Sequence, residues 1–280
     1  MATLVKDASN ERATLHNMFG LVRHRELIWQ LTKRELSTRY KGSYLGVLWS
    51  FIVPLTMLLV YTFVFSVVFK GQWGPRFSEM RPGEFALTLF AGLIPFNLFA
   101  EVVNRSPNLI LNVPNYVKKV VFPLEILPVV SLGAALIHSL IAGGVFLLGS
   151  LVFLKSISPT IVLLPLAYLP LLLLSLGLSW FLSALGVYIR DVGQGIGVFV
   201  QILFFMSPVF YPVSAVPQAL RIVLLINPLT TILDSFRAAL LWQESLPWGP
   251  WGLCTVVATA VAVLGYIWFA RTKPGFADVM

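Results

Sequence analysis

The residues of this chain that could carry out acid–base or metal chemistry are few and scattered. The three histidines, His16, His24 and His138, lie far apart in the sequence, and no pair of acidic residues stands at a position that suits catalysis. General acid–base catalysis and metal binding both need such groups close together. We therefore expect no catalytic residue and no metal site in this chain.

Asp234 and Arg237 are charged residues within an otherwise apolar region. A charge at the centre of a membrane helix costs about 2.5 to 3.5 kcal/mol. Because the two residues lie three apart, they can pair on one face of a helix, and pairing lowers that cost. His138 stands alone in another apolar run, where we expect it to bond a neighbouring carbonyl group.

The composition identifies the surroundings of these residues as a lipid bilayer. The chain is 58% hydrophobic and 11% charged, with a mean hydropathy of +0.85, whereas soluble domains carry about 25% charged residues. These values indicate a polytopic membrane protein. The single cysteine, Cys254, lies in an apolar run and excludes a disulfide framework.

The apolar runs predict an all-α membrane protein with six transmembrane helices. Residues 44–69 contain no charge across 26 positions, which is about 39 Å of helix against a hydrocarbon core of about 30 Å. The further spans are expected in the later part of residues 155–189, from residue 192 onward, and in residues 85–100, 126–154 and 245–270. The run of residues 85–100 is short and reaches spanning length only by taking Glu101 to the membrane interface.

The region of residues 208–243 departs from this pattern. Pro208, Pro212 and Pro217 follow one another within ten residues, so a straight helix cannot continue past Met206. Beyond them two short apolar segments meet at Asn227 and Pro228. Each is too short to cross a bilayer, and we expect re-entrant helices between spans five and six.

Residues 26–37 predict an amphipathic helix that lies in the membrane interface. Its polar positions fall on one narrow arc of a helical wheel, and these are Glu26, Gln30, Lys33, Arg34 and Ser37. Glu35 interrupts the apolar face, and we expect it to pair with Arg39 four residues on. The chain therefore divides into a cytoplasmic arm with this helix, residues 1–43, and one transmembrane domain, residues 44–280.

The basic residues give the orientation. Six spans place both termini on one side, and that side holds fourteen of the twenty Lys and Arg residues. The positive-inside rule makes it the cytoplasmic side. Orientation and anionic membrane lipids thus account for the formal charge of +8, and we expect no nucleic-acid partner.

Three stretches carry a resemblance to a known family. The strings RYKGSYLGVLWSFIVP (residues 39–54), FAGLIPFNLF (residues 90–99) and NPLTTILDSFR (residues 227–237) resemble the permease subunit of type-2 ATP-binding-cassette exporters. The branch that exports lipid-linked polysaccharides such as O-antigens is the most similar, and teichoic-acid and capsule exporters are near relatives. The resemblance covers nearly the whole chain.

The resemblance implies a homodimer in the bacterial inner membrane that docks on a separate ATPase subunit. This chain contains no Gly-x4-Gly-Lys-Ser/Thr phosphate loop, so ATP and Mg²⁺ would be bound by the partner, and no cofactor is expected here. The family's cytoplasmic coupling features map onto the helix that begins at Glu26 and onto the loop around Asn112, Pro114 and Tyr116.

The resemblance also gives roles to residues along the path of a lipid-linked polysaccharide. The phosphate of the lipid anchor would meet Arg39 and Lys41, near Lys33 and Arg34, because cations at the interface attract phosphate without burial. Aromatic rings suit sugar faces, and the polymer channel would be lined by Trp49, Tyr61, Phe65, Phe69, Phe204 and Phe205. The alternative for these rings is a role in packing or as interface anchors. The outer gate would comprise Asn227, Pro228, Asp234 and Arg237, for which a purely structural cap is the alternative.

Other functions stay open at this point. The cargo could be teichoic acid, a capsule polymer or another amphipathic molecule. A membrane-embedded transferase acting on lipid-linked sugars is an alternative from another class, as is a secondary transporter, although no inverted repeat is visible.

Overall fold

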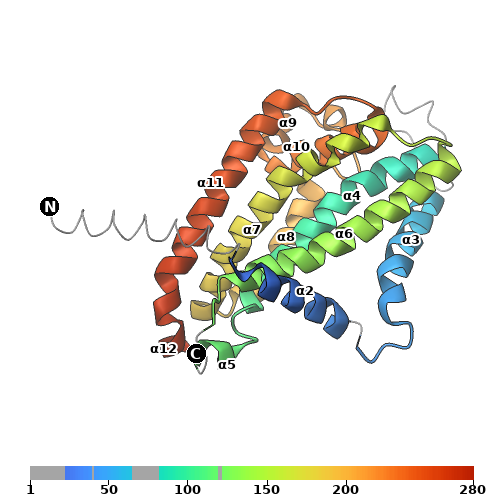
Figure 1. The fold of residues 1–280 in the computed structure, drawn as a ribbon. Helices are drawn as coiled ribbons and strands as arrows, with labels where there is room; N and C mark the ends of the chain where they lie inside the picture. The colour runs from blue at the N-terminus through green and yellow to red at the C-terminus, as the bar shows by residue number, and fades with distance from the viewer. Residues whose placement is uncertain (1–22, 40, 65–81, 119–121) are drawn as a thin grey trace.

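A computed structural model of the chain describes residues 23–39, 41–64, 82–118 and 122–280. These residues form helices joined by turns and loops, without strands (Figure 1). The helices used below are α2 (Arg25–Arg39), α3 (Trp49–Tyr61), α4 (Pro82–Arg105), α5 (Pro114–Lys118), α6 (Ile126–Phe153), α7 (Leu164–Tyr188), α8 (Val192–Met206), α9 (Gln218–Ile226), α10 (Pro228–Arg237), α11 (Trp248–Thr272) and α12 (Phe276–Val279).

Four helices in the described residues are long and apolar enough to cross a membrane. They occupy Gly83–Asn108, Ile126–Phe153, Pro159–Tyr188 and Trp248–Val279. Trp49–Val64 and Val192–Met206 are apolar but shorter. The prediction of an all-helical, multi-pass membrane protein is confirmed. The span that was predicted over residues 85–100 is longer in the structure, because α4 includes Glu101 and continues to Arg105.

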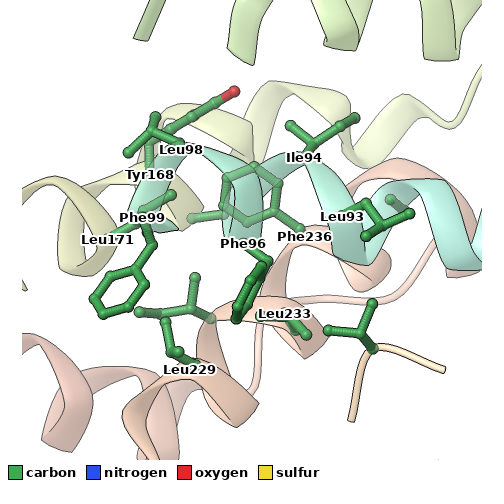
Figure 2. Close-up of a cluster of buried hydrophobic side chains, with 14 of the residues drawn as sticks. Leu93, Ile94, Phe96, Leu98, Phe99, Tyr168, Leu171, Leu229, Leu233 and Phe236 are labelled. Atoms are coloured by element: carbon green, nitrogen blue, oxygen red, sulfur yellow. The ribbon is translucent and has the colours of Figure 1, made fainter. Parts of the chain in front are cut away.

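Helix α4 is the centre of the bundle. Its most apolar stretch is 83% buried, whereas the corresponding stretches of α6, α7 and α11 are 28% to 39% buried. Figure 2 shows side chains of α4, α7 and α10 meeting in one cluster, among them Phe96, Tyr168 and Phe236. The outer helices therefore keep apolar faces for lipid or for other protein, while α4 fixes the positions of its neighbours.

Small residues allow α7 and α11 to approach closely. A Cβ added at Gly265 would lie 2.1 Å from the backbone oxygen of Gly177. Such contact between backbones is the usual reason for glycine in membrane helix interfaces. The pair forms one side of the bundle in Figure 1.

The predicted break before the last span is confirmed. Helix α8 ends at Met206, and α9 forms a bent pair with Pro228–Trp242, which begins with α10, at an angle of 86°. Asn227 lies at the bend, where its Oδ1 accepts a hydrogen bond from the backbone N–H of Leu229 at 3.0 Å. Its Nδ2 donates to Ser207 Oγ, also at 3.0 Å. Asn227 therefore caps α10 and ties the bend to the end of α8.

The two ends of the bundle differ. Helices α2, α5 and α12 lie at one end, and α9 and α10 lie at the other (Figure 1). Helix α2 crosses α6, and a Cβ at Gly133 of α6 would lie 3.1 Å from Thr32 Oγ1. Thr32 is the one buried residue of α2, so this helix is held at the α2 end by a narrow line of contact.

Candidate functional site

Three ionisable side chains from three helices meet at the α2 end of the bundle. Arg39 of α2 donates from Nη2 to Glu101 Oε1 of α4 at 2.7 Å. Its Nη1 lies 2.7 Å from Nδ1 of His138 on α6. The His138 nitrogen is itself 3.2 Å from Glu101 Oε2. These contacts connect the end of α2 to α4 and to α6.

A second ion pair extends this cluster. Glu35 pairs with Arg105 Nη2, and Arg105 Nη1 lies 3.9 Å from Glu101 Oε1. The prediction that Glu35 pairs with Arg39 was wrong, since the crossing of α2 turns Glu35 toward α4. His138, which was expected to bond a neighbouring carbonyl group, has Arg39 and Glu101 within reach of its Nδ1.

The cluster lies partly within the depth of the bundle. His138 is twelve residues into α6, which places it about 18 Å along that helix. Ionisable residues inside membrane helices are rare and mark functional positions by default. The sequence signals that could have identified this cluster are Glu101 and His138, each of which interrupts an apolar run.

A pocket of about 270 Å³ opens beside the cluster, between α3, α4 and α6. Arg39, Glu101 and His138 form its ionisable part. One face of α3 contributes Trp49, Val53, Met57 and Tyr61, and the opposite wall includes Phe90, Leu93, Ala135 and Ala142. The pocket is therefore mostly apolar, with its charged groups gathered at Arg39.

A second pocket, of about 400 Å³, lies between α2, α6 and the loop around α5. Arg34, Arg39 and Arg105 line it together with Glu35 and Tyr116. Arg39 is the residue that both pockets share. Arg39 thus borders both an apolar pocket and a basic one.

The other cations predicted to meet phosphate lie on the outer surface. Lys41 is exposed, and Lys33 Nζ lies 5.3 Å above the Trp29 ring. Arg34 is exposed and lines the basic pocket. Glu26, which was predicted to take part in coupling to the ATPase, accepts a hydrogen bond from Gln30 at 3.1 Å within the same helix. The structure therefore brings Arg34 and Arg39 together at one pocket and leaves Lys33 outside its lining.

The predicted coupling loop is compact. Pro114 begins α5, and the backbone N–H of Asn112 donates to Asn108 O at 3.0 Å. The Tyr116 ring stacks on Phe122 with a centroid distance of 4.5 Å. Since Tyr116 also lines the basic pocket, this loop and α2 form neighbouring parts of one surface.

Of the predicted channel aromatics, Tyr61, Phe204 and Phe205 belong to one chain of ring contacts, and Trp49 lies apart from them at the apolar pocket. The Tyr61 ring lies 6.3 Å from Phe210, which lies 5.0 Å from Phe204, so these rings of α3 and α8 are brought together through Phe210. Phe205 is 60% exposed. Trp49 donates to Ser43 Oγ at 3.0 Å and lines the apolar pocket. Phe65 and Phe69 lie outside the described residues.

Arg237 is the central residue of the predicted outer gate. Its side chain is 2% exposed, and it donates to Val209 O at 2.8 Å and Thr88 O at 3.3 Å. Its Nη1 lies 3.4 Å from Asp234 Oδ1, which confirms the predicted pairing. Pro228 occupies the first turn of α10 after Asn227. These contacts hold α10 against α4 and against the end of α8.

Within the described ranges, no group of three or more His, Cys, Asp or Glu side chains is arranged to hold a metal ion. The ionisable cluster contains one carboxylate and one imidazole around Arg39. A guanidinium group between them favours anion contacts over metal binding.

Comparison with known proteins gives consistent matches. Residues 26–241 match the model of a family described as ABC-2 type transporter. An O-antigen export system permease protein of Myxococcus xanthus is 30% identical over 229 residues, 81% of this chain and 84% of that protein. An O-antigen export system permease protein of Klebsiella pneumoniae is 24% identical over 258 residues, 91% of this chain and 95% of that protein. A polysialic acid transport protein of Escherichia coli is 25% identical over 213 residues, 74% of this chain and 78% of that protein.

Proposed function

Because the chain belongs to the ABC-2 type transporter family, of which it is a membrane permease subunit, we propose that it exports a lipid-linked polysaccharide of the O-antigen kind. The observation that carries the proposal is the similarity to two O-antigen export permeases along most of both chains. In such systems nucleotide binding and ATP hydrolysis belong to a separate subunit. Export of a capsule polymer or teichoic acid is the second candidate, favoured by the match to a polysialic acid transport protein.

The membrane topology we propose has six spans. The four long helices, α4, α6, α7 and α11, would form the second, third, fourth and sixth spans. The two shorter apolar helices, α3 and α8, would form the first and fifth spans. The bent pair of α9 and α10 then serves as a re-entrant hairpin at the outer face. This places α2, α5 and both termini at the cytoplasmic face of the bacterial inner membrane, in agreement with the positive-inside rule. Residues 1–43 precede a single transmembrane domain, residues 44–280.

Coupling to the ATPase would use the α2 end. Helix α2, with Glu26 in its first turn, and the α5 loop, with Asn112, Pro114 and Tyr116, lie beside the same pocket. Two ion pairs from α2 to α4 and the contact of Arg39 with His138 of α6 offer a connection from this surface to the spans. A movement of the ATPase would thereby reach α4 and α6.

The cargo would pass along a homodimer seam formed by α3 and α8. Its phosphate would enter near Arg39 and Lys41, with Lys33 and Arg34 beside them. Tyr61, Phe204 and Phe205 would offer aromatic surface to the sugars, with Trp49 nearer the entrance and Phe65 and Phe69 farther along. At the outer face Asn227, Pro228, Asp234 and Arg237 would hold the hairpin that closes the exit, for which the buried contacts of Arg237 are the support.

Deletion of this chain in its own bacterium tests the proposal. We expect surface polysaccharide to be lost while complete polymer on its lipid anchor accumulates inside the cell. Immunoblotting of intact and lysed cells measures both pools, and chemical analysis of the trapped polymer separates O-antigen from capsule or teichoic acid. A deletion strain with short or missing polymer would instead indicate a transferase, and unchanged surface polysaccharide would contradict any export role.

A further inference from the structure

The apolar pocket and the basic pocket meet at Arg39, and we propose that together they bind one phosphate-headed lipid. The hydrocarbon chain would lie between α3, α4 and α6, and the phosphate would lie among Arg34, Arg39 and Arg105. The inference deepens the proposed function and rests on it for assigning Arg34 and Arg39 to a phosphate. It differs in placing the chain inside one subunit, behind α3.

The walls of the first pocket suit a hydrocarbon chain. Residues at every fourth position of α3, from Trp49 through Val53 and Met57 to Tyr61, present one continuous face to it. Alanines at positions 135 and 142 leave room on the α6 side. A volume of about 270 Å³ is near the lower end of small-molecule pockets. Apolar walls without a filling partner lose dispersion contacts, which a lipid chain would restore.

The second pocket suits an anion. Its three arginines are partly neutralised by Glu35 in the lining and by Glu101 beside Arg39, which leaves a surplus of one positive charge. Arg105 Nη1 is buried and has no hydrogen-bond partner among the described residues. A buried N–H without an acceptor is costly. A phosphate oxygen is an acceptor that forms strong bonds with guanidinium groups.

Arg39 makes the two pockets one site. Two of its donors are engaged by Glu101 and His138, and a guanidinium group has five. Its side chain keeps 30% of its surface exposed. The remaining donors can therefore reach a phosphate at the mouth of the basic pocket, while Glu101 and His138 hold the group where the chain enters.

Photolabelling of the full chain, purified with its ATPase in lipid nanodiscs, tests this site. The probe is a single-chain alkyl phosphate with a diazirine in the chain, and mass spectrometry locates the labelled peptides. We expect labels on α3 and α6 at pocket-lining residues. Ala142→Trp fills the pocket and should reduce this labelling about tenfold, as a steric mismatch in an apolar pocket does. Leu148→Trp, at a 66% exposed position of the same helix, is the matched control and should change nothing. Met57→Trp fills the pocket from α3 if Ala142→Trp does not assemble.

The phosphate is tested by a pair of variants on one helix. Arg34→Gln should reduce labelling by the alkyl phosphate about tenfold, the effect of losing one charge-assisted hydrogen bond. Arg25→Gln, at an exposed position in the first turn of α2 and outside the pocket lining, should not. A probe with an uncharged hydroxyl head should be insensitive to both changes. The proposal is overturned if Ala142→Trp and Met57→Trp leave labelling unchanged, or if Arg34→Gln affects the charged and uncharged probes equally.

Competition identifies the source of the lipid. Phosphatidylglycerol and an isoprenyl diphosphate are each added as competitors of the alkyl phosphate. Preference for the first supports a membrane phospholipid, and preference for the second supports the anchor of the cargo. Competition by neither overturns the site. Since no transport is measured, a negative result leaves the deletion experiment on export unaffected.

Discussion

Gly92 of α4 lies directly against the guanidinium group of Arg237, so that a Cβ added at Gly92 would be 2.7 Å from Arg237 Nη2. The guanidinium cannot move away, because the carbonyl groups of Thr88 and Val209 fix it from two sides. We predict that Gly92→Ala destabilises the protein by about 1 to 3 kcal/mol, as overpacking of a buried site does. Thermal melting of the purified complex measures this. Gly144→Ala, where no atom lies within 4 Å of the added Cβ, should be neutral or slightly stabilising.

Arg237 itself should be more important for stability than its charge suggests. Arg237→Met removes the donor to two buried carbonyl groups and to Asp234, and we expect a loss of about 3 kcal/mol. Arg221→Met is the matched control. Arg221 also donates to two carbonyl groups, but both lie in the segment just before its own helix, at Ser214 and Val216. Equal melting temperatures for the two variants would show that Arg237 does not hold the hairpin.

The pairing of Glu35 with Arg105 should be recoverable by exchange of charges. Glu35→Arg and Arg105→Glu alone each place like charges together, and the double variant restores an attractive pair between α2 and α4. Because both side chains are partly exposed, we expect a coupling of only about 1 kcal/mol. Resistance of α2 to trypsin, compared among the four proteins, reports the effect. Additive effects in the double variant would mean that the pair does not hold α2.

The elements and their local contacts were predictable, and contacts across helices were not. The pairing of Asp234 with Arg237 follows from a spacing of three residues on one helix. By contrast, Glu35 has Arg39 at helical spacing and still pairs with Arg105, because the crossing of α2 over α6 decides which way each side chain points. His138 was treated as isolated for the same reason, since its partners come from α2 and α4. Sequence spacing fixes neighbours on a helix, and the angle between helices fixes the rest.

If exposed aromatic rings of α8 touch the polymer, Phe205 should matter more than Phe199. Both are half or more exposed on the same helix, and six positions apart they lie on different faces. Phe205→Ala should lower export about 2- to 10-fold, the value of one aromatic contact, and Phe199→Ala should not. Surface polysaccharide measured over time, at equal amounts of complex, checks this. A larger effect at position 199 would place the polymer on the other face of α8.

The stacked pair of Tyr116 and Phe122 allows the coupling proposal to be separated from simple folding. Tyr116→Phe keeps the ring that stacks at 4.5 Å and removes the hydroxyl group that is available to a partner. Tyr116→Ala removes both. If the ATPase grips the ring, Tyr116→Ala should reduce polymer-stimulated ATP hydrolysis about tenfold, as the loss of an aromatic anchor at an interface does, while Tyr116→Phe stays close to the parent. If the ATPase contacts only the hydroxyl group, both variants should lose polymer-stimulated ATP hydrolysis. Co-purification of the ATPase shows whether assembly survives. Unchanged stimulated hydrolysis in an assembled Tyr116→Ala complex would exclude this loop from coupling and leave α2 as the connection to the ATPase.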